Sequence, residues 1–185
     1  MDDHRLVKEC LRGKAVAQRQ LYDRFAPALL AVCYRYTKSV ADAEDVLQEG
    51  FVKAFKNLQQ FKGEGELGAW LRRIMVTTAI NYLKKASRYQ AEMLFGDEQL
   101  HVVSSYQPQL NLEAKELADL IRQLPAGYQT IFNLHAVEGY SHVEIGQLLG
   151  INESTSRSQY ARGRALLIRW IEQRNNEVKN RTYAR

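Results

Sequence analysis

The chain has 185 residues, enough for one large or two small domains, and its 45% hydrophobic and 25% charged content is typical of a folded globular protein. A net charge of +5 favours an anionic partner, although the distribution of charge along the chain is more informative than the sum. Cys10 and Cys33 form neither a C-x-x-C pair nor a disulfide framework, and there is no signal-peptide pattern or membrane-length apolar run. We therefore expect a cytoplasmic protein without membrane insertion.

Helical periodicity dominates the first ninety residues. An apolar stripe at helical spacing contains Pro27, which predicts either a kink or the start of a fresh helix. Ser39 and Asp42 predict a capping box at the start of a second helix. A loop at residues 61–67, which contains two glycines, separates that helix from a third, expected over about residues 68–86.

Residues 91–111 have no clean periodicity and no Lys or Arg, which predicts a flexible acidic linker. Helical patterns resume at residue 112 and end in a polar, basic tail at 176–185 that is expected to fray. The sequence thus predicts an all-α protein of two small helical domains, residues 1–90 and 112–175, joined by the linker.

The second domain contains a helix-turn-helix pattern. Ser141 and Glu144 form an S-x-x-E capping box, Gly150 can take the left-handed conformation that ends a short helix, and Asn152 can cap the next one. One face of that next helix carries residues suited to a DNA major groove: Ser154, Thr155, Arg157, Ser158, Ala161 and Arg162. The alternative is an ordinary helical hairpin with a solvated basic face.

The second helix carries an acidic face, with four residues at i, i+3, i+4 and i+7: Asp45, Gln48, Glu49 and Val52. Such a face suits docking on a basic helical partner, and a merely solvated face is the alternative. A di-iron site would need Glu-x-x-His pairs, which this chain lacks. His135 and His142 have no ligand partners at metal-site spacing and are expected to be surface residues, so we expect no metal or cofactor.

The third helix carries a basic face, whose Lys and Arg side chains can contact phosphates and whose Thr and Asn can reach bases: Arg73, Thr77, Asn81, Lys84 and Arg88. Phe61, Lys62 and Gly63 form the preceding loop, and Trp70 lies near its mouth. A flexible loop beside an aromatic ring and a basic helix could bind an unstacked base of single-stranded DNA. Alternatively, Trp70 is a core residue.

Several strings of residues resemble one family. A-D-A-E-D-V-L-Q-E-G-F at 41–51, F-K-G-E at 61–64 and A-W-L-R-R-I at 69–74 are similar to the second conserved region of extracytoplasmic-function (ECF) sigma factors. L-P-A-G-Y-Q at 124–129, with the helix-turn-helix, is similar to their fourth region. The resemblance implies a non-enzymatic subunit that binds core RNA polymerase and directs it to promoter DNA.

The resemblance also implies a role for each surface. The acidic helix would dock on the clamp coiled coil of the largest polymerase subunit, the third helix and its loop would recognise and open the −10 element, and the helix-turn-helix would read the −35 element. A separate anti-sigma factor is the expected inhibitor. Thr77, Ser156, Gln159 and Tyr160 depart from the commoner family residues, which leaves the promoter sequence open.

Two other classes of function remain to be compared. A free-standing helix-turn-helix repressor would need neither the acidic face nor the loop, and such repressors usually dimerise on palindromic sites. A helical-bundle enzyme would need a nucleophile–base pair or metal ligands, and the sequence shows neither.

Overall fold

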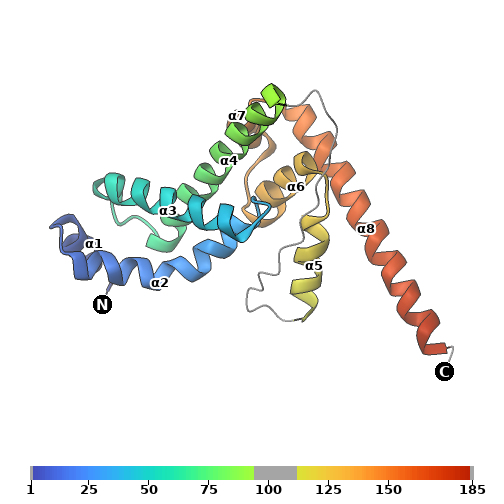
Figure 1. Ribbon diagram of the computed structural model, residues 1–185, viewed down its shortest axis with the longest axis horizontal. Helices are drawn as coiled ribbons and strands as arrows, with labels where there is room; N and C mark the ends of the chain where they lie inside the picture. Colours follow the sequence, from blue (N-terminus) through green and yellow to red (C-terminus); the bar gives the residue numbers. More distant parts are fainter. Residues whose placement is uncertain (1, 94–111, 184–185) are drawn as a thin grey trace. The chain divides into compact units, whose positions relative to one another are not determined.

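The computed structural model describes residues 2–93 and 112–183, and these ranges are helical with no strand in them (Figure 1). The chain divides into two compact units, Met1–Tyr106 and Gln107–Arg185. The predicted all-α class with two helical domains is confirmed. Most of the predicted linker lies outside the described residues, and residues 91–93 are helical rather than linker.

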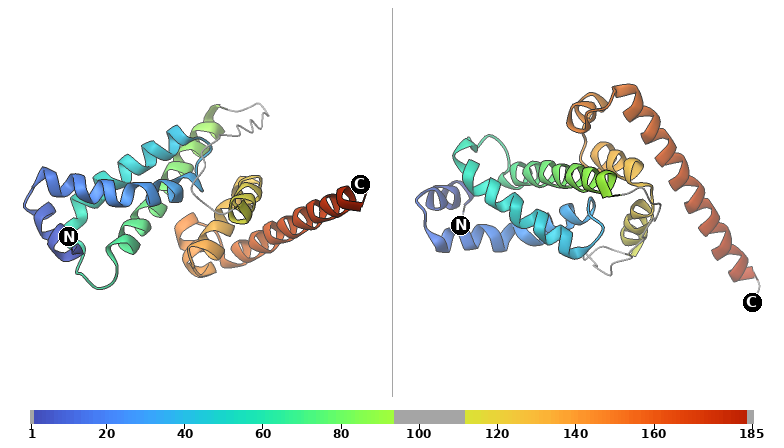
Figure 2. Two further views of the ribbon diagram at one scale, coloured as in Figure 1. Left: turned by 90° about the horizontal axis from the view of Figure 1, so that it is seen from below. Right: turned by 45° about the horizontal axis from the view of Figure 1, so that its top comes forward.

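The first unit is built from four helices and one short 3-10 turn: α1 (Asp3–Leu11), α2 (Ala15–Tyr34), α3 (Val40–Asn57), η1 (Leu58–Gln60) and α4 (Leu67–Met93). Helices α2, α3 and α4 pack on one another, and α1 packs on α2 (Figure 2). Each contributes fully buried apolar side chains to a common core, among them Leu6, Leu21, Val46, Leu71 and Met75. Gly50 allows α3 and α4 to approach closely, because a Cβ there would collide with the sulfur of Met75.

Helix α2 continues through Pro27, so the prediction that a fresh helix starts there is wrong. Proline in a helix interior removes one hydrogen bond, here the one to the carbonyl of Asp23. Both Asp23 and Pro27 are exposed, which allows water to replace the missing donor. Burial of the flanking Leu21 and Leu29 keeps the helix on the core.

The predicted capping box at the start of α3 forms only in part. Ser39 Oγ accepts from the backbone N–H of Asp42 at 3.1 Å, as expected of an N-cap. The carboxylate of Asp42, however, accepts from the Tyr82 hydroxyl at 2.6 Å. Asp is one methylene shorter than the Glu of a capping box, and here its carboxylate ties α3 to α4 instead.

Two helices are longer than predicted. Helix α4 ends at Met93 rather than near residue 86, and α8 (Glu153–Tyr183) continues through most of the tail that was expected to fray. Neither extension contains Gly or Pro, so no residue stops the helix. In α8, Arg174 also forms a 3.2 Å ion pair with Glu116 of α5 (Leu112–Arg122).

The second unit contains α5 and α8 together with α6 (Ala126–Phe132), the π-helical turn η2 (Asn133–Val137) and α7 (His142–Leu149). Its apolar cluster joins α5 to α8 and consists of Leu120, Ile121, Leu124 and Leu167, with Tyr128, Phe132, Leu166 and Trp170 packed against it. Gly163 is buried where α8 crosses α6, and an added Cβ there would lie 3.1 Å from the Cβ of Tyr128.

The helix-turn-helix forms as predicted. Ser141 and Glu144 make both capping-box bonds, and Gly150 ends α7 at φ 73°. Gly146 lies under the turn, where an added Cβ would approach the carbonyl oxygen of Ile151 to 2.7 Å. The turn therefore depends on a close backbone approach inside α7 as well as on the left-handed glycine.

Candidate functional site

The acidic face of α3 is open to solvent. Asp45, Gln48 and Glu49 are exposed, and Val52 keeps 52% of its surface accessible. Lys53 forms an ion pair with Glu49 at 2.7 Å, and the hydrogen bond from Lys53 is the main reason that the pKa of Glu49 lies below its ordinary value. The exposed Val52, one turn after Glu49, gives this face an apolar component beside its charged one.

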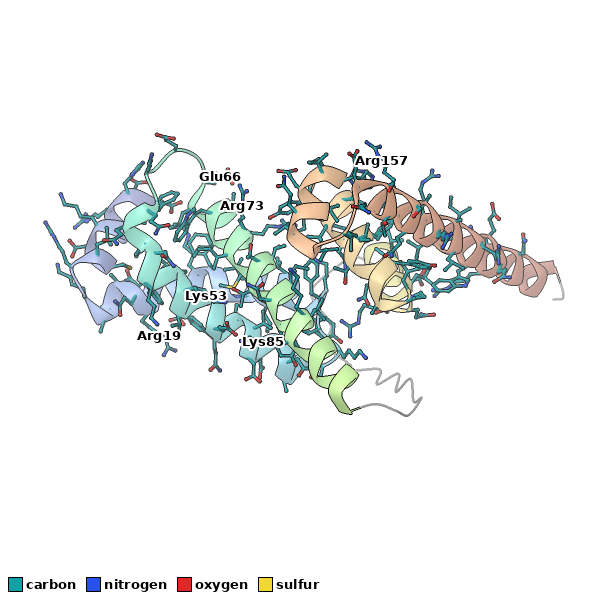
Figure 3. The ribbon with its side chains drawn as sticks, turned by 90° about the horizontal axis from the view of Figure 1, so that it is seen from above. Arg19, Lys53, Glu66, Arg73, Lys85 and Arg157 are labelled. Carbon is teal, nitrogen blue, oxygen red and sulfur yellow. The ribbon has the colours of Figure 1, made fainter. Side chains whose placement is uncertain are left out.

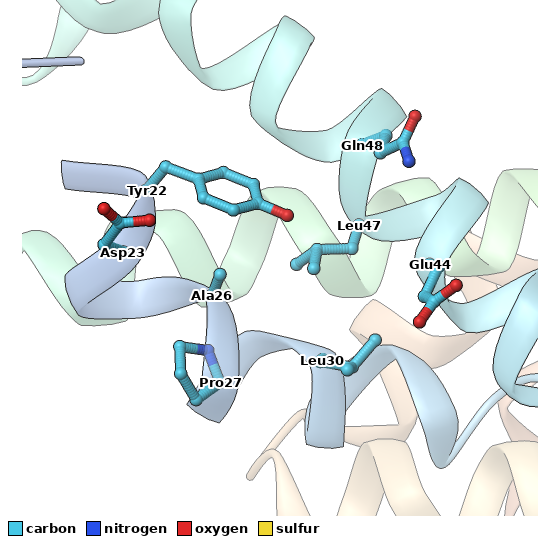
Figure 4. Close-up of a pocket in the computed structure, with 8 residues that line it drawn as sticks. All are labelled: Tyr22, Asp23, Ala26, Pro27, Leu30, Glu44, Leu47 and Gln48. Atoms are coloured by element: carbon cyan, nitrogen blue, oxygen red, sulfur yellow. The ribbon is translucent and has the colours of Figure 1, made fainter. Parts of the chain in front are cut away.

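A shallow pocket adjoins this face between α2 and α3, with a volume of about 410 Å³. Figure 4 shows Tyr22, Asp23, Ala26, Pro27 and Leu30 from α2 on one side, with Glu44, Leu47 and Gln48 from α3 on the other. Gln48 belongs both to the pocket and to the acidic face, so the two are continuous. Sequence periodicity did not predict this α2 contribution, because it depends on how the helices pack.

The basic face of α4 is also exposed. Arg73, Thr77, Asn81 and Lys84 are accessible to solvent, and Figure 3 shows Arg73 near the N-terminal part of the helix. The Thr77 hydroxyl donates to the backbone oxygen of Arg73 at 2.9 Å, so its remaining capacity for a DNA contact is as an acceptor. The side chain of Arg88 lies outside the described residues.

The loop before α4 is shaped by glycine and supported by aromatic packing. Gly63 and Gly65 have φ values of 76° and 98°, which favour glycine. Phe61 and Trp70 pack with ring centroids 5.7 Å apart, and both are half-buried. Trp70 is therefore not a fully buried core residue, and Lys62 between the ring and the glycines is exposed.

Sequence reasoning missed one neighbour of this loop. His4 of α1 lies against Gly63, where an added Cβ would come within 3.1 Å of its Nδ1 atom. Helix α1 is held by burial of Leu6, Val7 and Cys10. It therefore gives His4 a fixed support beside the loop, a contact that no local pattern in the sequence could reveal.

The outer face of α8 carries the predicted DNA-reading residues. Ser154, Arg157, Ser158, Ala161 and Arg162 are exposed, and Thr155 is half-buried. The Nε atom of Arg157 donates to Glu153 at 2.9 Å, one turn earlier. This ion pair directs the guanidinium along the helix, towards its N-terminal end.

The inner face of α8 explains two of the residues that depart from the family pattern. Ser156 is fully buried and lies 2.9 Å from the Nδ1 atom of His142, and Tyr160 packs against the rings of Phe132, His135 and His142. His135 and His142, which were expected to be surface residues, are half-buried, and their rings stack at 4.2 Å. The turn between η2 and α7 brings the two rings together.

Over the described ranges, no cluster of three or more His, Cys, Asp or Glu side chains could hold a metal ion. A search of the same residues for a helix both long and apolar enough to cross a membrane finds none.

Comparison with known families matches both units. Residues 21–89 match the model of Sigma-70 region 2, and residues 114–167 match that of Sigma-70 region 4. The chain is 30% identical over 183 residues to the ECF RNA polymerase sigma-E factor of Haemophilus influenzae, covering 93% of this chain and 96% of that protein. The chain belongs to the ECF sigma factor family.

Other relatives agree with this assignment. The ECF sigma factor SigW of Bacillus subtilis is 29% identical, over 87% of this chain and 92% of its own. The crystal structure of the sigma factor RpoE with the anti-sigma factor NepR, from Bartonella quintana, has the same fold. Its TM-score is 0.52 at 22% identity, over 83% of this chain and 96% of that one.

As an ECF sigma factor, the chain is a transcription initiation factor that directs RNA polymerase to promoters, and it is not an enzyme. A free-standing repressor would account for the region 4 match but not for the region 2 match, which covers α3, α4 and the loop between them.

Proposed function

We propose that three surfaces divide the work of initiation. The acidic face of α3, extended by the α2–α3 pocket, docks on core RNA polymerase. The loop at residues 61–66 and the basic face of α4 recognise and open the −10 element. The outer face of α8 reads the −35 element. Residues 1–90 and 112–175 would then be the domains that carry these roles.

The acidic and basic faces of the first unit support this division. Asp45 and Glu49 are exposed on the same face of α3 as Val52, in the two helical turns before it, whereas Arg73 and Lys84 are exposed on α4. A protein partner with basic residues suits the acidic face of α3, and a nucleic acid suits the basic face of α4. The reverse assignment would place phosphates against the acids of α3 and basic protein residues against the bases of α4, and both contacts would be repulsive. This segregation within one unit is the observation that carries the proposal.

The loop supports a role in strand opening. Its left-handed glycines have no side chain and so allow a nucleic-acid strand to approach the backbone of the loop. The half-buried Phe61–Trp70 pair provides an aromatic surface beside it. Aromatic stacking contributes about 1–3 kcal/mol per unstacked base, which offsets part of the cost of separating the strands.

Regulation is proposed to come from a separate anti-sigma factor in the cytoplasm, where RNA polymerase acts. Such a protein occurs with the sigma factor RpoE of Bartonella quintana, which shares this fold. Occupation of the acidic face of α3 by such an inhibitor would exclude core polymerase from the same surface.

The docking surface is tested by measuring the affinity of the double variant Asp45→Ala, Glu49→Ala for core RNA polymerase. Removing one partner of a desolvated charge pair costs about 2–5 kcal/mol, so affinity for core should fall at least tenfold. The matched control, Asp119→Ala with Glu172→Ala, removes two exposed acids from the second unit and should bind core as the unmodified chain does. Unchanged affinity in the α3 variant, with unchanged helical content, would refute the assignment.

A further inference from the structure

Four aromatic rings meet on the inner side of α8, and one of them, Tyr160, comes from α8 itself. His135 of η2 and His142 of α7 stack with centroids 4.2 Å apart and an interplanar angle of 23°. Tyr160 of α8 lies edge-on to both, at 4.7 Å and 5.7 Å, and Phe132 of α6 stacks on Tyr160 at 5.7 Å. The four rings come from four successive elements of the second unit, so each element is held against the others through this cluster.

Hydrogen bonds fix both histidine rings. His135 Nδ1 lies 2.8 Å from the carbonyl oxygen of Tyr140, which can only accept, so Nδ1 carries the proton. His142 Nδ1 lies 2.9 Å from Ser156 Oγ, and Ser156 is fully buried. The hydroxyl of α8 thus has its partner on α7, and losing that partner would leave a buried polar group unsatisfied.

Ser156 lies between two residues of the DNA-reading face, Thr155 and Arg157. Because successive helical residues are about 100° apart, fixing Ser156 on the inner side sets the direction of both neighbours. Tyr160 adds a second fixed point one turn later. A rotation of α8 about its axis would break the ring contacts and the serine bond together.

We propose that His142 and His135 are positioning residues for promoter reading: their stacked rings and the His142–Ser156 bond hold the recognition helix in the orientation that presents Arg157 to the −35 element. The inference rests on the proposed role of α8. It adds residues that do not touch DNA and a dependence on their charge.

The surroundings of His142 favour its neutral form. Its pKa lies below the ordinary 6.5, first because of burial, then because of His135 of η2 and Arg157 of α8, while Glu153 of α8 acts in the opposite direction. On its own helix, Glu144 is engaged by Ser141 in the capping box, and His142 is the first residue of α7, where the helix dipole disfavours a cation.

The direction of the pH effect follows. Well above pH 6.5, His142 is neutral whether its ring is stacked on His135 or apart from it, so no charge on His142 opposes the stack. As the pH falls from 6.5 through the lowered pKa, any state with the rings apart binds the proton more readily, so the stack is progressively disfavoured. A protonated His142 can still donate to Ser156 Oγ, so the effect comes from partial desolvation of the charged ring and from its repulsion by His135 and Arg157.

The experiment measures how strongly the holoenzyme depends on the −35 element at each pH. Two promoters share one −10 element; one carries a −35 element recovered by selection with the holoenzyme, and the other carries a scrambled −35. The ratio of their occupancies between pH 5.5 and 8 cancels effects of pH on core binding and on the −10 element. For the unmodified chain the ratio should fall towards pH 5.5, by no more than about tenfold, because pH 5.5 lies only one pH unit below the ordinary pKa of histidine.

Variants separate positioning from a general structural role. His142→Gln keeps a hydrogen-bonding group for Ser156, since its amide can donate or accept, but it cannot titrate. The ratio at pH 8 should therefore be largely kept and its pH dependence reduced. His142→Ala lacks both the ring and the hydrogen bond with Ser156 and should lower the ratio at every pH. His101→Gln, which removes a histidine from the linker, should keep the full pH dependence.

An unchanged ratio in His142→Ala at pH 8, or an undiminished pH dependence in both His142→Gln and His135→Gln, would overturn the proposal. If His142→Ala prevents the second unit from folding, so that it shows no unfolding transition, the pH dependence of His142→Gln and His135→Gln tests the proposal instead. Core-dependent transcription from the −10 element should persist throughout, and its absence in the unmodified chain would refute the proposed function rather than this inference.

Discussion

A methyl group added at Gly146 tests the close packing of the helix-turn-helix. The new Cβ of Gly146→Ala would lie 2.7 Å from the backbone oxygen of Ile151, against the 3.4–4 Å of ordinary contact. That backbone cannot easily retreat, since the N–H groups of Ile151 and Gly150 donate to the Gly146 carbonyl at 3.0 and 2.8 Å. The substitution therefore pushes apart a turn that its own hydrogen bonds hold closed.

The expected magnitude is a difference of two terms. Overpacking costs about 1–3 kcal/mol, and the fixed backbone favours the upper end of that range. Alanine recovers about 1 kcal/mol of helix propensity over glycine. The free energy of unfolding of the second unit should therefore fall by about 2 kcal/mol, or about 8–16 °C in Tm for a unit of this size.

Thermal unfolding of the full chain, followed by Trp170 fluorescence in a Trp70→Phe background, measures the second unit alone. The matched control is Gly127→Ala in α6, where the nearest atom is the mobile Oε1 of Gln159 at 3.1 Å. There the propensity gain should dominate, leaving Tm unchanged or raised. A Gly146→Ala protein with unaltered Tm, or equal losses in both variants, would refute the reasoning.

Three further predictions concern DNA reading, the α3–α4 contact and the linker. Arg157→Ala should cost about 1–3 kcal/mol only at promoters with a −35 element, whereas Lys84→Ala should weaken all promoters and lower the salt slope of holoenzyme binding by about one; equal losses from Arg157→Ala at promoters with and without that element would contradict the assignment. Tyr82→Phe should lower the stability of the first unit in urea unfolding by about 1–2 kcal/mol through loss of the bond to Asp42. Because burial raises the pKa of Tyr82 from 10 to about 12, the unmodified unit should lose stability as the pH rises above 10, and the Tyr82→Phe unit should lack that loss. Deleting about ten residues within 96–105 should abolish transcription that needs both elements at their native spacing, since an extended chain covers only about 3.3–3.6 Å per residue; undiminished activity would show that the linker does not set the reach.

The features that the sequence predicted well are local ones. The Ser141–Glu144 capping box and the left-handed Gly150 depend on residues within one or two turns of each other, and both formed as expected. The spacing of Asp45, Gln48 and Glu49 likewise placed them on one exposed face. Such features follow from helical geometry alone.

Features that depend on distant residues were not predictable. Asp42 bonds to Tyr82 forty positions away, and His4 reaches Gly63 only because α1 packs beside η1. His135 and Ser156 meet His142 through the path of two turns, so periodicity gave no sign of them. The ends of α4 and α8 lie beyond the predicted ones because these stretches contain no Gly or Pro to stop a helix.

The most direct test of the account is promoter protection by purified components. The chain alone, core polymerase alone and the two together are each footprinted on a promoter obtained by selection with the holoenzyme. We expect protection of both the −10 and −35 elements, and opening at −10, only when chain and core are both present. Equal protection of duplex DNA by the chain without core would contradict the central claim and identify a free-standing DNA-binding protein.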